Sequence, residues 1–327
     1  MDIRKLGLTF NTIFEKWMFL IIPCSLIFGF LLERPLQAFV PAVPYLFAFV
    51  TLTMAMGCGL NHLRGVMKRP GIMLLTFLLA HVVSAVIAYA AGVAIFGADS
   101  PYVVGLVLFT IIPLGVSSVL WVGMSGGSVP LMLAMVVLDS LLSPLVVPAG
   151  VHAFFGTGVE VKAGPLMLDL TIIIVLPTII GVVLYELSKG TAAVRTKPIA
   201  APISKLCFVS VVALNASAIA PYVEELKRDM ALLVPVVIVL VGICYAVGFV
   251  FTAGLRDRET QTTVSYATGM RNISLGIVLA MGYFSPLAAV PVVLSILIQQ
   301  PVATVHHYVL HKLNRNKTGN AVRTHVR

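Results

Sequence analysis

The sequence predicts an all-α membrane protein with about ten transmembrane helices. Of its 327 residues, 59% are hydrophobic and only 11% are charged, whereas soluble domains carry about 25% charged residues. The mean hydropathy is +1.03. The apolar residues form continuous runs long enough to cross a bilayer as helices, rather than the short alternating segments of a membrane barrel. These observations predict a multi-pass protein without a sizeable soluble domain.

The apolar runs, taken in chain order, predict the individual transmembrane helices. They cover residues 17–32, 42–60, 72–96, 102–124, 128–152, 164–186, 204–222, 232–254, 261–284 and 286–310. The first run is long and lacks a small-residue cleavage site, so we expect a helix that is kept rather than a cleaved signal peptide. The tail, residues 312–327, is basic and polar. We expect it to be disordered and to lie on the anionic inner leaflet.

The distribution of positive charge predicts the orientation of these helices. If both termini are cytosolic, the cytosolic segments hold 17 Lys and Arg residues and the outer segments hold four, with Arg271 left inside a helix. The positive-inside rule therefore predicts a protein of the cell (inner) membrane with both termini in the cytosol. The net charge of +9 follows from this arrangement and does not indicate nucleic-acid binding.

The longest predicted cytosolic segment divides the helices into two sets of five. An odd number of helices in each half forces the halves into opposite orientations, which is the arrangement of an inverted repeat. We therefore expect a first repeat followed by the sixth helix in residues 1–186, a cytosolic linker in 187–203, helices seven to ten in 204–311, and the tail.

Two of the runs contain polar and helix-breaking residues near their middle. The fourth is interrupted at Pro113, Gly115, Ser117 and Ser118, and the ninth at Gly269, Arg271 and Asn272. Pro113 removes a helix hydrogen bond, and Gly115 and Gly269 lower the cost of unwinding. Because unwound backbone inside a membrane is tolerated only where it is buried in protein or lines a cavity, the paired breaks predict a substrate site near the midplane. A structural kink without a ligand is the alternative.

Two charged residues lie near the middle of predicted helices. Arg271 is near the middle of the ninth run and Asp139 is near the middle of the fifth. A bare charge at that depth costs from roughly 3 to more than 10 kcal/mol, and such residues usually face a cavity, a partner or a substrate. They are therefore leading candidates for a functional site. A structural salt bridge between the fifth and ninth helices is the alternative.

Several motifs resemble the bile acid:sodium symporter family. Residues 53–60 (TMAMGCGL), followed by 68–70 (KRP), are similar to that family's second helix and the loop after it. Residues 113–148 are similar to its fourth and fifth helices, and 269–272 (GMRN) is similar to its ninth-helix motif Gly-Met-Gln-Asn. The resemblance covers essentially all the predicted helices.

The resemblance implies an architecture and a function. It implies a core domain of helices 3–5 and 8–10, a panel domain of helices 1, 2, 6 and 7, and crossed broken helices 4 and 9. It also implies secondary transport by alternating access between the two domains. The family's substrates are mostly organic anions such as bile acids and small carboxylates.

Departures from the family pattern bear on sodium. Sodium-using relatives hold a glutamate at the position of Ala267 and a glutamine at the position of Arg271. Their fifth-helix hydroxyl residues fall on Met132 and Val136 here, and a third-helix glutamine corresponds to His81. Because carbonyl and hydroxyl oxygens suit a hard cation, these replacements predict that sodium is not bound in the family manner.

One hypothesis is that Arg271 stands in for a bound cation. Its guanidinium could bind an anionic substrate bidentately, and backbone N–H groups near Ser117, Ser118 and Asn272 would add donors. Asp139 would neutralise Arg271 when the site is empty.

A second hypothesis is that His81 and Asp139 couple transport to protons. Histidine titrates near neutral pH, and histidine and carboxylate groups inside membranes often form proton relays. A hydrogen-bonded contact between helices is the alternative explanation for His81.

Other polar residues are weaker candidates. Asn215 in the seventh helix could face the substrate or could join helices by hydrogen bonding. Gln299 and Gln300 could line the same region, Trp121 lies near the fourth-helix break, and Asp169 is expected near the membrane surface.

Other function classes fit the sequence less well. An uncoupled facilitator or channel for a small solute is one alternative, and a sodium-dependent bile acid-type symporter with rearranged ion sites is another. No motif of an intramembrane enzyme or of a metal site is present. The expected partners are a small organic anion, the bilayer and, under the second hypothesis, protons. No cofactor and no nucleic acid is expected.

Overall fold

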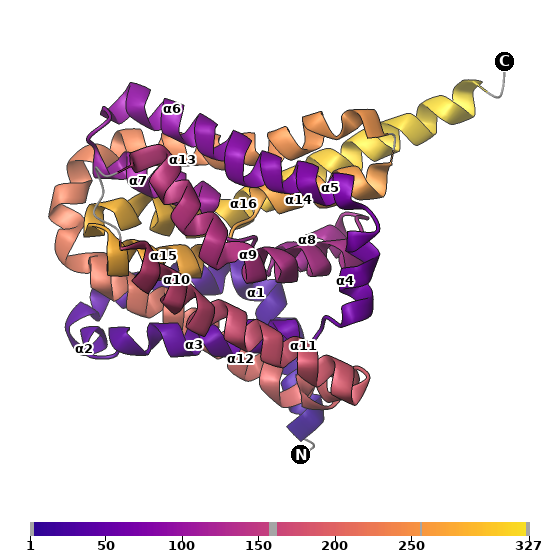
Figure 1. Ribbon diagram of the computed structural model, residues 1–327, viewed down its shortest axis with the longest axis horizontal. Coiled ribbons are helices and arrows are strands. Elements are labelled where there is room, and N and C mark those ends of the chain that lie inside the picture. The colour runs from indigo at the N-terminus through magenta and orange to yellow at the C-terminus, as the bar shows by residue number, and fades with distance from the viewer. Residues whose placement is uncertain (1–2, 157–161, 256, 325–327) are drawn as a thin grey trace.

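The residues that the structure describes form helices almost throughout (Figure 1). The computed structural model describes the backbone of residues 3–156, 162–255 and 257–324. The α-helices are α1 (Ile3–Leu31), α2 (Glu33–Gln37), α3 (Val43–Ala55), α4 (Leu60–Met67), α5 (Pro70–Phe77), α6 (Ser84–Phe96), α7 (Pro101–Ile111), α8 (Ser118–Met124), α9 (Val129–Phe155), α10 (Ala163–Leu170), α11 (Leu176–Ser188), α12 (Thr191–Ile219), α13 (Val223–Phe251), α14 (Arg258–Gly269), α15 (Ile273–Tyr283) and α16 (Pro286–Thr324). Short 3₁₀-helices are η1 (Val40–Ala42), η4 (Ala220–Tyr222) and η5 (Ala253–Leu255), and π-helices are η2 (Leu78–Val83) and η3 (Thr171–Val175).

The helices account for the predicted membrane spans. Among the described residues, 6 helical runs are long and apolar enough to cross a membrane. Shorter apolar helices occupy the other predicted spans, at Leu20–Leu31, Val40–Ala55, Pro101–Ile111 and Ile273–Tyr283. The last two are short because the fourth and ninth runs are each split into two helices.

Two spans contain a π-helical stretch that the sequence analysis did not anticipate. η2 joins α5 to α6 as one continuous run, and η3 joins α10 to α11 in the same way. A π-helical turn shifts the backbone hydrogen-bond register by one residue and often marks a functional position. η2 contains Ala80 and His81.

Capping residues explain where two of the helices begin. The Ser100 hydroxyl accepts a hydrogen bond from the Tyr102 N–H at the start of α7. The Asp257 carboxylate accepts hydrogen bonds from the N–H groups of Glu259 and Thr260 at the start of α14. Both caps satisfy N–H groups that have no partner within the helix.

The helices pack in two groups that meet at α9 and the broken helices. α1, α3, α11 and α12 contact one another, and α6, α7, α13, α14, α15 and α16 contact one another. α3, α11 and α12 run along the lower part of Figure 1, and α6 and α13 run along its upper part. α9 contacts α10 and α11 as well as α7 and α14.

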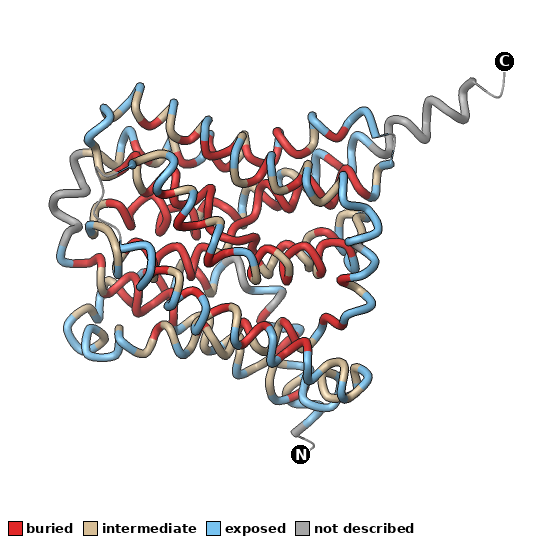
Figure 2. The backbone as a smooth tube through the Cα atoms, viewed as in Figure 1, coloured by how far each residue is buried: buried red, intermediate tan, exposed pale blue. Residues whose placement is uncertain are grey.

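Burial follows the position of each helix in the bundle. Figure 2 shows buried backbone concentrated in the middle of the molecule, with exposed residues on its periphery. Every residue of α14 from Thr260 to Gly269 is buried, although this helix is rich in Thr, Ser and Gln. Large apolar side chains such as Leu145 and Val239 are instead exposed. This arrangement suits a bilayer, because lipid accepts apolar surface and a polar helix must be enclosed by protein.

The structure differs from the sequence expectation at the linker and the tail. α12 begins at Thr191, so most of the expected linker of residues 187–203 is helical, and only a tight turn at Lys189 and Gly190 separates α11 from α12. α16 continues to Thr324, so the tail that was expected to be disordered is helical up to that residue. The helix can continue because the chain after Pro301 contains no further proline. Residues 325–327 lie outside the described residues.

Candidate functional site

The two helix breaks meet and satisfy each other's backbone groups. The Gly115 N–H donates to the Met270 carbonyl at 2.9 Å, and the Asn272 N–H donates to the Pro113 carbonyl at 2.8 Å. The break between α7 and α8 is therefore bonded to the break between α14 and α15, as in a short antiparallel bridge. This pairing explains how unwound backbone is tolerated inside the bundle, since its polar groups are not left open.

The glycines of the two breaks have different roles. A Cβ atom at Gly115 would lie 2.7 Å from the Arg271 carbonyl oxygen, so glycine allows the two backbones to approach. Gly269 is the last residue of α14 rather than part of the unwound segment. A Cβ there would lie 2.4 Å from the Tyr245 ring, so this glycine is needed for helix packing.

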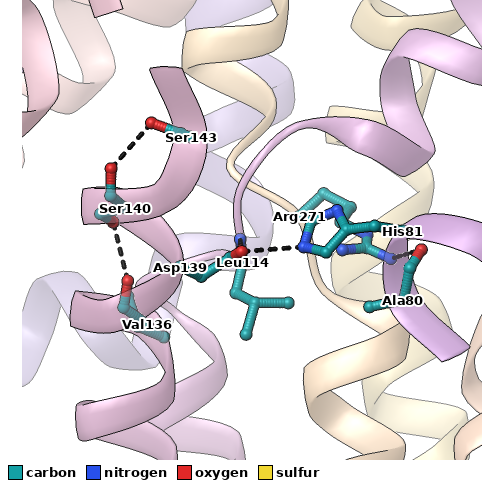
Figure 3. Close-up of polar contacts among 8 residues, drawn as sticks. All are labelled: Ala80, His81, Leu114, Val136, Asp139, Ser140, Ser143 and Arg271. Carbon is teal, nitrogen blue, oxygen red and sulfur yellow. Dashed lines mark hydrogen bonds and ion pairs between the residues drawn. The ribbon is translucent and has the colours of Figure 1, made fainter. Parts of the chain in front are cut away.

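The Arg271 side chain is buried and points toward η2. Its Nη2 atom donates to the Ala80 carbonyl at 2.6 Å, and the side chain is directed toward Ala80 and His81 in Figure 3. Its Nε and Nη1 atoms are buried without a hydrogen-bond partner. Arg271 thus carries a positive charge inside the bundle with most of its donors unused.

Asp139 does not form the expected ion pair with Arg271. Its Oδ1 atom lies 2.8 Å from His81 Nε2, and its Oδ2 atom accepts a hydrogen bond from the Leu114 N–H at 2.7 Å (Figure 3). Only 1% of the Asp139 side chain is exposed, and these two contacts occupy both carboxylate oxygens. Asp139 has these partners because π-helical η2 brings His81 to α9 and because the fourth-helix break leaves the Leu114 N–H without a helical acceptor.

Two glutamines of α16 support the breaks. Gln299 Oε1 accepts a hydrogen bond from the Arg271 N–H at 2.7 Å, and Gln299 Nε2 donates to the Arg271 carbonyl at 3.3 Å. Gln300 Oε1 accepts a hydrogen bond from Trp121 Nε1 at 2.8 Å, and Gln300 Nε2 donates to Ser117 Oγ at 3.4 Å. Sequence reasoning ranked both glutamines low, because adjacent amides in an apolar run do not reveal which backbone they reach.

A cavity of about 410 Å³ lies beside the meeting point of the breaks. Its polar lining includes Ser117, Asn272, Ser274, Gln299 and Gln300, and its apolar lining includes Phe14, Ile22, Phe47, Phe208 and Ile296. The Ser274 hydroxyl is buried without a hydrogen-bond partner. Ser204 and Lys205 of α12 also line the cavity, so its polar groups come from the breaks, α16 and α12, and its aromatic side chains come from α1, α3 and α12.

The structure brings some of the candidate residues to this cavity and not others. Gly115, Ser117, Arg271 and Asn272 line it. The lining residues do not include Ser118, Asn215, Pro113, Gly269, His81 or Asp139.

Two of the proposed binding residues have other surroundings. Ser118 is buried and its hydroxyl donates to the Gly115 carbonyl. Asn215 is buried in α12, and its amide nitrogen has no partner. Neither side chain is therefore placed to contact a ligand in the cavity.

The sequence profile of the sodium bile acid symporter family matches residues 43–225. This chain belongs to that family. It is a secondary transporter and a multi-pass membrane protein rather than an enzyme.

Individual relatives support the assignment. The chain is 32% identical over 294 residues to the uncharacterized protein YbaS of Bacillus subtilis (strain 168), which covers 90% of this chain and 96% of YbaS. It is 28% identical over 191 residues to the uncharacterized sodium-dependent transporter YocS of the same organism, covering 58% of each chain. It is 26% identical over 252 residues to the probable sodium/metabolite cotransporter BASS2, chloroplastic, of Oryza sativa subsp. japonica, covering 76% of this chain and 58% of that protein.

In this symporter-family member, the positions compared above with sodium ligands are apolar or cationic. Ala267, Met132 and Val136 are all fully buried. Arg271 donates to a backbone carbonyl, the type of oxygen that a hard cation would otherwise bind. The candidate site is thus a polar-walled cavity next to a fixed positive charge.

Proposed function

We propose that this protein transports a small organic anion by alternating access. The observation that carries the proposal is the meeting of two broken helices beside a cavity, with Arg271 built into the meeting point. Paired helix breaks near the midplane are typical of substrate sites in secondary transporters. The carrier would expose this cavity to each side of the membrane in turn.

An anionic substrate suits the polar wall of the cavity. α15 begins at Ile273, so its first N–H groups and the positive end of its dipole lie beside the cavity. Ser274 adds a buried hydroxyl without a partner, and Asn272 adds a side chain that makes no capping hydrogen bond. Arg271, which also lines the cavity, adds a fixed positive charge. The aromatic side chains of Phe14, Phe47 and Phe208, which also line the cavity, would hold an apolar substrate body.

We further propose that Arg271 replaces a coupling sodium ion. The guanidinium donates to the Ala80 carbonyl, and a second cation beside it would be repelled. The buried Ala267, Met132 and Val136 supply no oxygen ligand from their side chains. This reading differs from the sodium dependence that the names of YocS and BASS2 state for those proteins.

Proton coupling would use the His81–Asp139 pair. Asp139 accepts hydrogen bonds from His81 and from the Leu114 N–H, so it joins a titratable ring directly to the fourth-helix break. A change in the protonation of this pair would alter the hydrogen bond that holds the break. The break lines the cavity, so proton occupancy and substrate occupancy would be linked.

The packing supports a division into core and panel domains. α1, α3, α11 and α12 correspond to the proposed panel, and α6, α7, α13, α14, α15 and α16 contact one another in the proposed core. Under this proposal helices 4 and 9 cross at their breaks, the two halves are inverted repeats, and both termini lie in the cytosol. The cavity lies between the two groups, where domain movement would open and close it.

The experiment measures binding first and coupling second. Purified protein is screened against small organic anions by thermal shift, with and without sodium, because a ligand that binds the native state raises the melting temperature. Radiolabelled hits are then tested for uptake into proteoliposomes under an imposed pH gradient or an imposed sodium gradient. We expect uptake to respond to the pH gradient and to be indifferent to sodium.

Arg271→Ala supplies the first mutational test. Removing the fixed charge should abolish uptake while leaving expression intact, whereas the exposed Arg64→Ala variant should transport normally. Full uptake by Arg271→Ala would contradict the role given to this residue. Uptake that requires sodium would favour a symporter with rearranged ion sites, and flux that never concentrates solute would favour an uncoupled facilitator.

A further inference from the structure

A second, larger cavity adjoins the candidate site. It measures about 910 Å³ and lies where α3 and α11 end and α12 begins. It shares Val50, Val116, Ser204 and Lys205 with the smaller cavity. The two cavities therefore adjoin at these four residues.

The lining of this larger cavity is strongly basic. It includes Lys189, Arg195, Lys197 and Lys205, and none of the described residues that line it is Asp or Glu. We call this cavity, with these four cations, the basic vestibule.

The carboxylate nearest to these cations along the chain is engaged elsewhere. Glu186 lies two residues before the end of α11, and its Oε1 atom accepts a hydrogen bond from the Leu60 N–H at the start of α4. Glu186 is not among the residues that line the vestibule. Among the described residues, no ion pair joins Glu186 to Lys189, Arg195 or Lys197.

The turn between α11 and α12 gathers three of the four cations. Lys189 and Gly190 both adopt left-handed backbone conformations, with φ of 52° and 79°. This conformation ends α11 and starts α12 within two residues. Lys189, Arg195 and Lys197 therefore all line the same cavity. A non-glycine residue in this conformation is uncommon. The residue that adopts it here, Lys189, is one of the cations that line the vestibule.

We propose that the basic vestibule attracts the transported anion to the candidate site and disfavours cations. A cleft lined by charge of one sign focuses the electric field and raises the local concentration of counter-ions. The inference rests on the proposed function for the identity of the ion as cargo. The sign and the location of the potential can be tested without any substrate.

The test measures the potential with charged thiol reagents. Cysteine is introduced at Ser204, which lines both cavities, in a background where Cys24 and Cys207 are serine because Cys58 and Cys244 are buried. The protein in nanodiscs of neutral lipid is labelled with the anionic sulfonatoethyl or the cationic trimethylammonioethyl methanethiosulfonate. Each rate is divided by the rate of the same reagent with a small neutral thiol, and the ratio of the two normalised rates reports the potential, because ionisation of the thiol introduced at Ser204 affects both rates equally.

At low ionic strength we expect the anionic reagent to be favoured on the order of tenfold. The preference should fall toward unity at about 1 M salt, where screening acts over about 3 Å. Replacing Lys189, Arg195 and Lys197 by glutamine in one triple variant should remove most of the preference for the anionic reagent. A ratio near unity in the parent protein, or one that survives neutralisation, would overturn the proposal.

Matched controls separate the vestibule from general surface charge. Arg64→Gln in α4 and Lys68→Gln just after it remove exposed cations that do not line the vestibule, and both should leave the ratio unchanged. Cysteine at Ser285, between α15 and α16, should show no preference that depends on Lys189, Arg195 or Lys197. Single neutralised variants are used if the triple variant does not fold.

Anionic lipid is the competing occupant. Adding phosphatidylglycerol to the nanodiscs should leave the ratio at Ser204→Cys unchanged if the vestibule serves a soluble anion. Equal protection from both reagents by this lipid would assign the cations to a lipid headgroup and would overturn the proposal.

A transport arm uses an anion identified by the thermal-shift screen. Neutralising the vestibule should raise KM for loading from this end of the protein and leave KM from the opposite end unchanged. If no organic anion is transported by the parent protein, the proposed function fails while the labelling result stands. A labelling ratio near unity together with normal transport rejects only the vestibule.

Discussion

At the residue scale, Asp139 rather than Arg271 is the centre of the hydrogen-bond network. One carboxylate oxygen meets His81 and the other meets the backbone of Leu114, so a single side chain joins η2, α9 and the fourth-helix break. Arg271 instead donates to Ala80 and keeps two nitrogens without a partner. The two buried charges therefore have different roles. Asp139 holds the fourth-helix break, and Arg271 supplies positive charge that no described carboxylate pairs with directly.

Replacing Asp139 should separate its structural role from its role in coupling. Asp139→Asn can still accept the Leu114 hydrogen bond, so it should keep most of the thermal stability but lose any dependence of uptake on the pH gradient. Asp139→Ala leaves both partners without an acceptor in a buried site, and it should destabilise the protein by about 3 kcal/mol. Melting curves and proteoliposome uptake measure the two effects. Retention of pH-gradient dependence in Asp139→Asn would exclude the pair from coupling.

At the element scale, the breaks depend on close approach between two backbones. Gly115→Ala would place a Cβ atom 2.7 Å from the Arg271 carbonyl oxygen. Because backbone cannot move aside as a flexible side chain can, this variant should lower the melting temperature and abolish uptake. Gly164→Ala in α10 is the matched control, since a Cβ there meets nothing within 4 Å. It should be neutral, or more stable by up to about 1 kcal/mol, and a similar loss in both variants would contradict this account.

The cap of α14 should make that helix sensitive to pH. The Thr260 hydroxyl hydrogen bond, and then the N–H groups of Thr260 and Glu259, lower the pKa of Asp257 below its ordinary value. The folded pKa is depressed, so the stabilisation is present above the unfolded value of about 3.9 and is lost as the pH falls through the folded pKa.

Substitution of the cap provides the measurement. Asp257→Ala should cost about 1 kcal/mol at pH 7, and the difference from the parent should shrink in melting curves taken below about pH 4. Asp257→Asn should keep the cap at both pH values. A deficit in Asp257→Ala that is equally large in acid would show that ionisation of this carboxylate is not involved.

At the scale of the whole molecule, the two ends of the bundle differ. The larger cavity lies where α3 and α11 end. At the opposite end, the Tyr283 hydroxyl of α15 donates to Asp169 of α10, a hydrogen bond between the proposed core and panel domains. This bond would have to break when the carrier opens at that end.

Tyr283→Phe should therefore shift the carrier toward its other state. Loss of one hydrogen bond is worth about 1 kcal/mol, so labelling of Ser204→Cys should slow severalfold as the vestibule closes. Tyr102→Phe is the control, because the Tyr102 hydroxyl bonds to Asp229 between α7 and α13, which both belong to the proposed core. Equal effects of the two variants would argue against a contact that reports domain movement.

Sequence reasoning located the breaks but not what surrounds them. Pro113 and the glycines have local consequences for helix formation, so the broken fourth and ninth helices could be predicted. The role of Gln299 depends on a contact with Arg271, 28 positions away, and Asn215 and Ser118 could not be excluded from the cavity until neighbouring helices were in place. Contacts of this kind follow from packing, which composition does not report.

The sequence by itself determined that this is a multi-pass membrane protein, which apolar runs form helices and which two of these runs are broken, because each depends on local composition. Only the tertiary structure decided that Asp139 binds His81, 58 positions away, and that Arg271 reaches Ala80, 191 positions away. The physical reason is that a buried polar group is satisfied by whichever partner packing brings to it. Asp139 therefore pairs with His81 rather than with Arg271, and the Nε and Nη1 donors of Arg271 have no partner among the described residues.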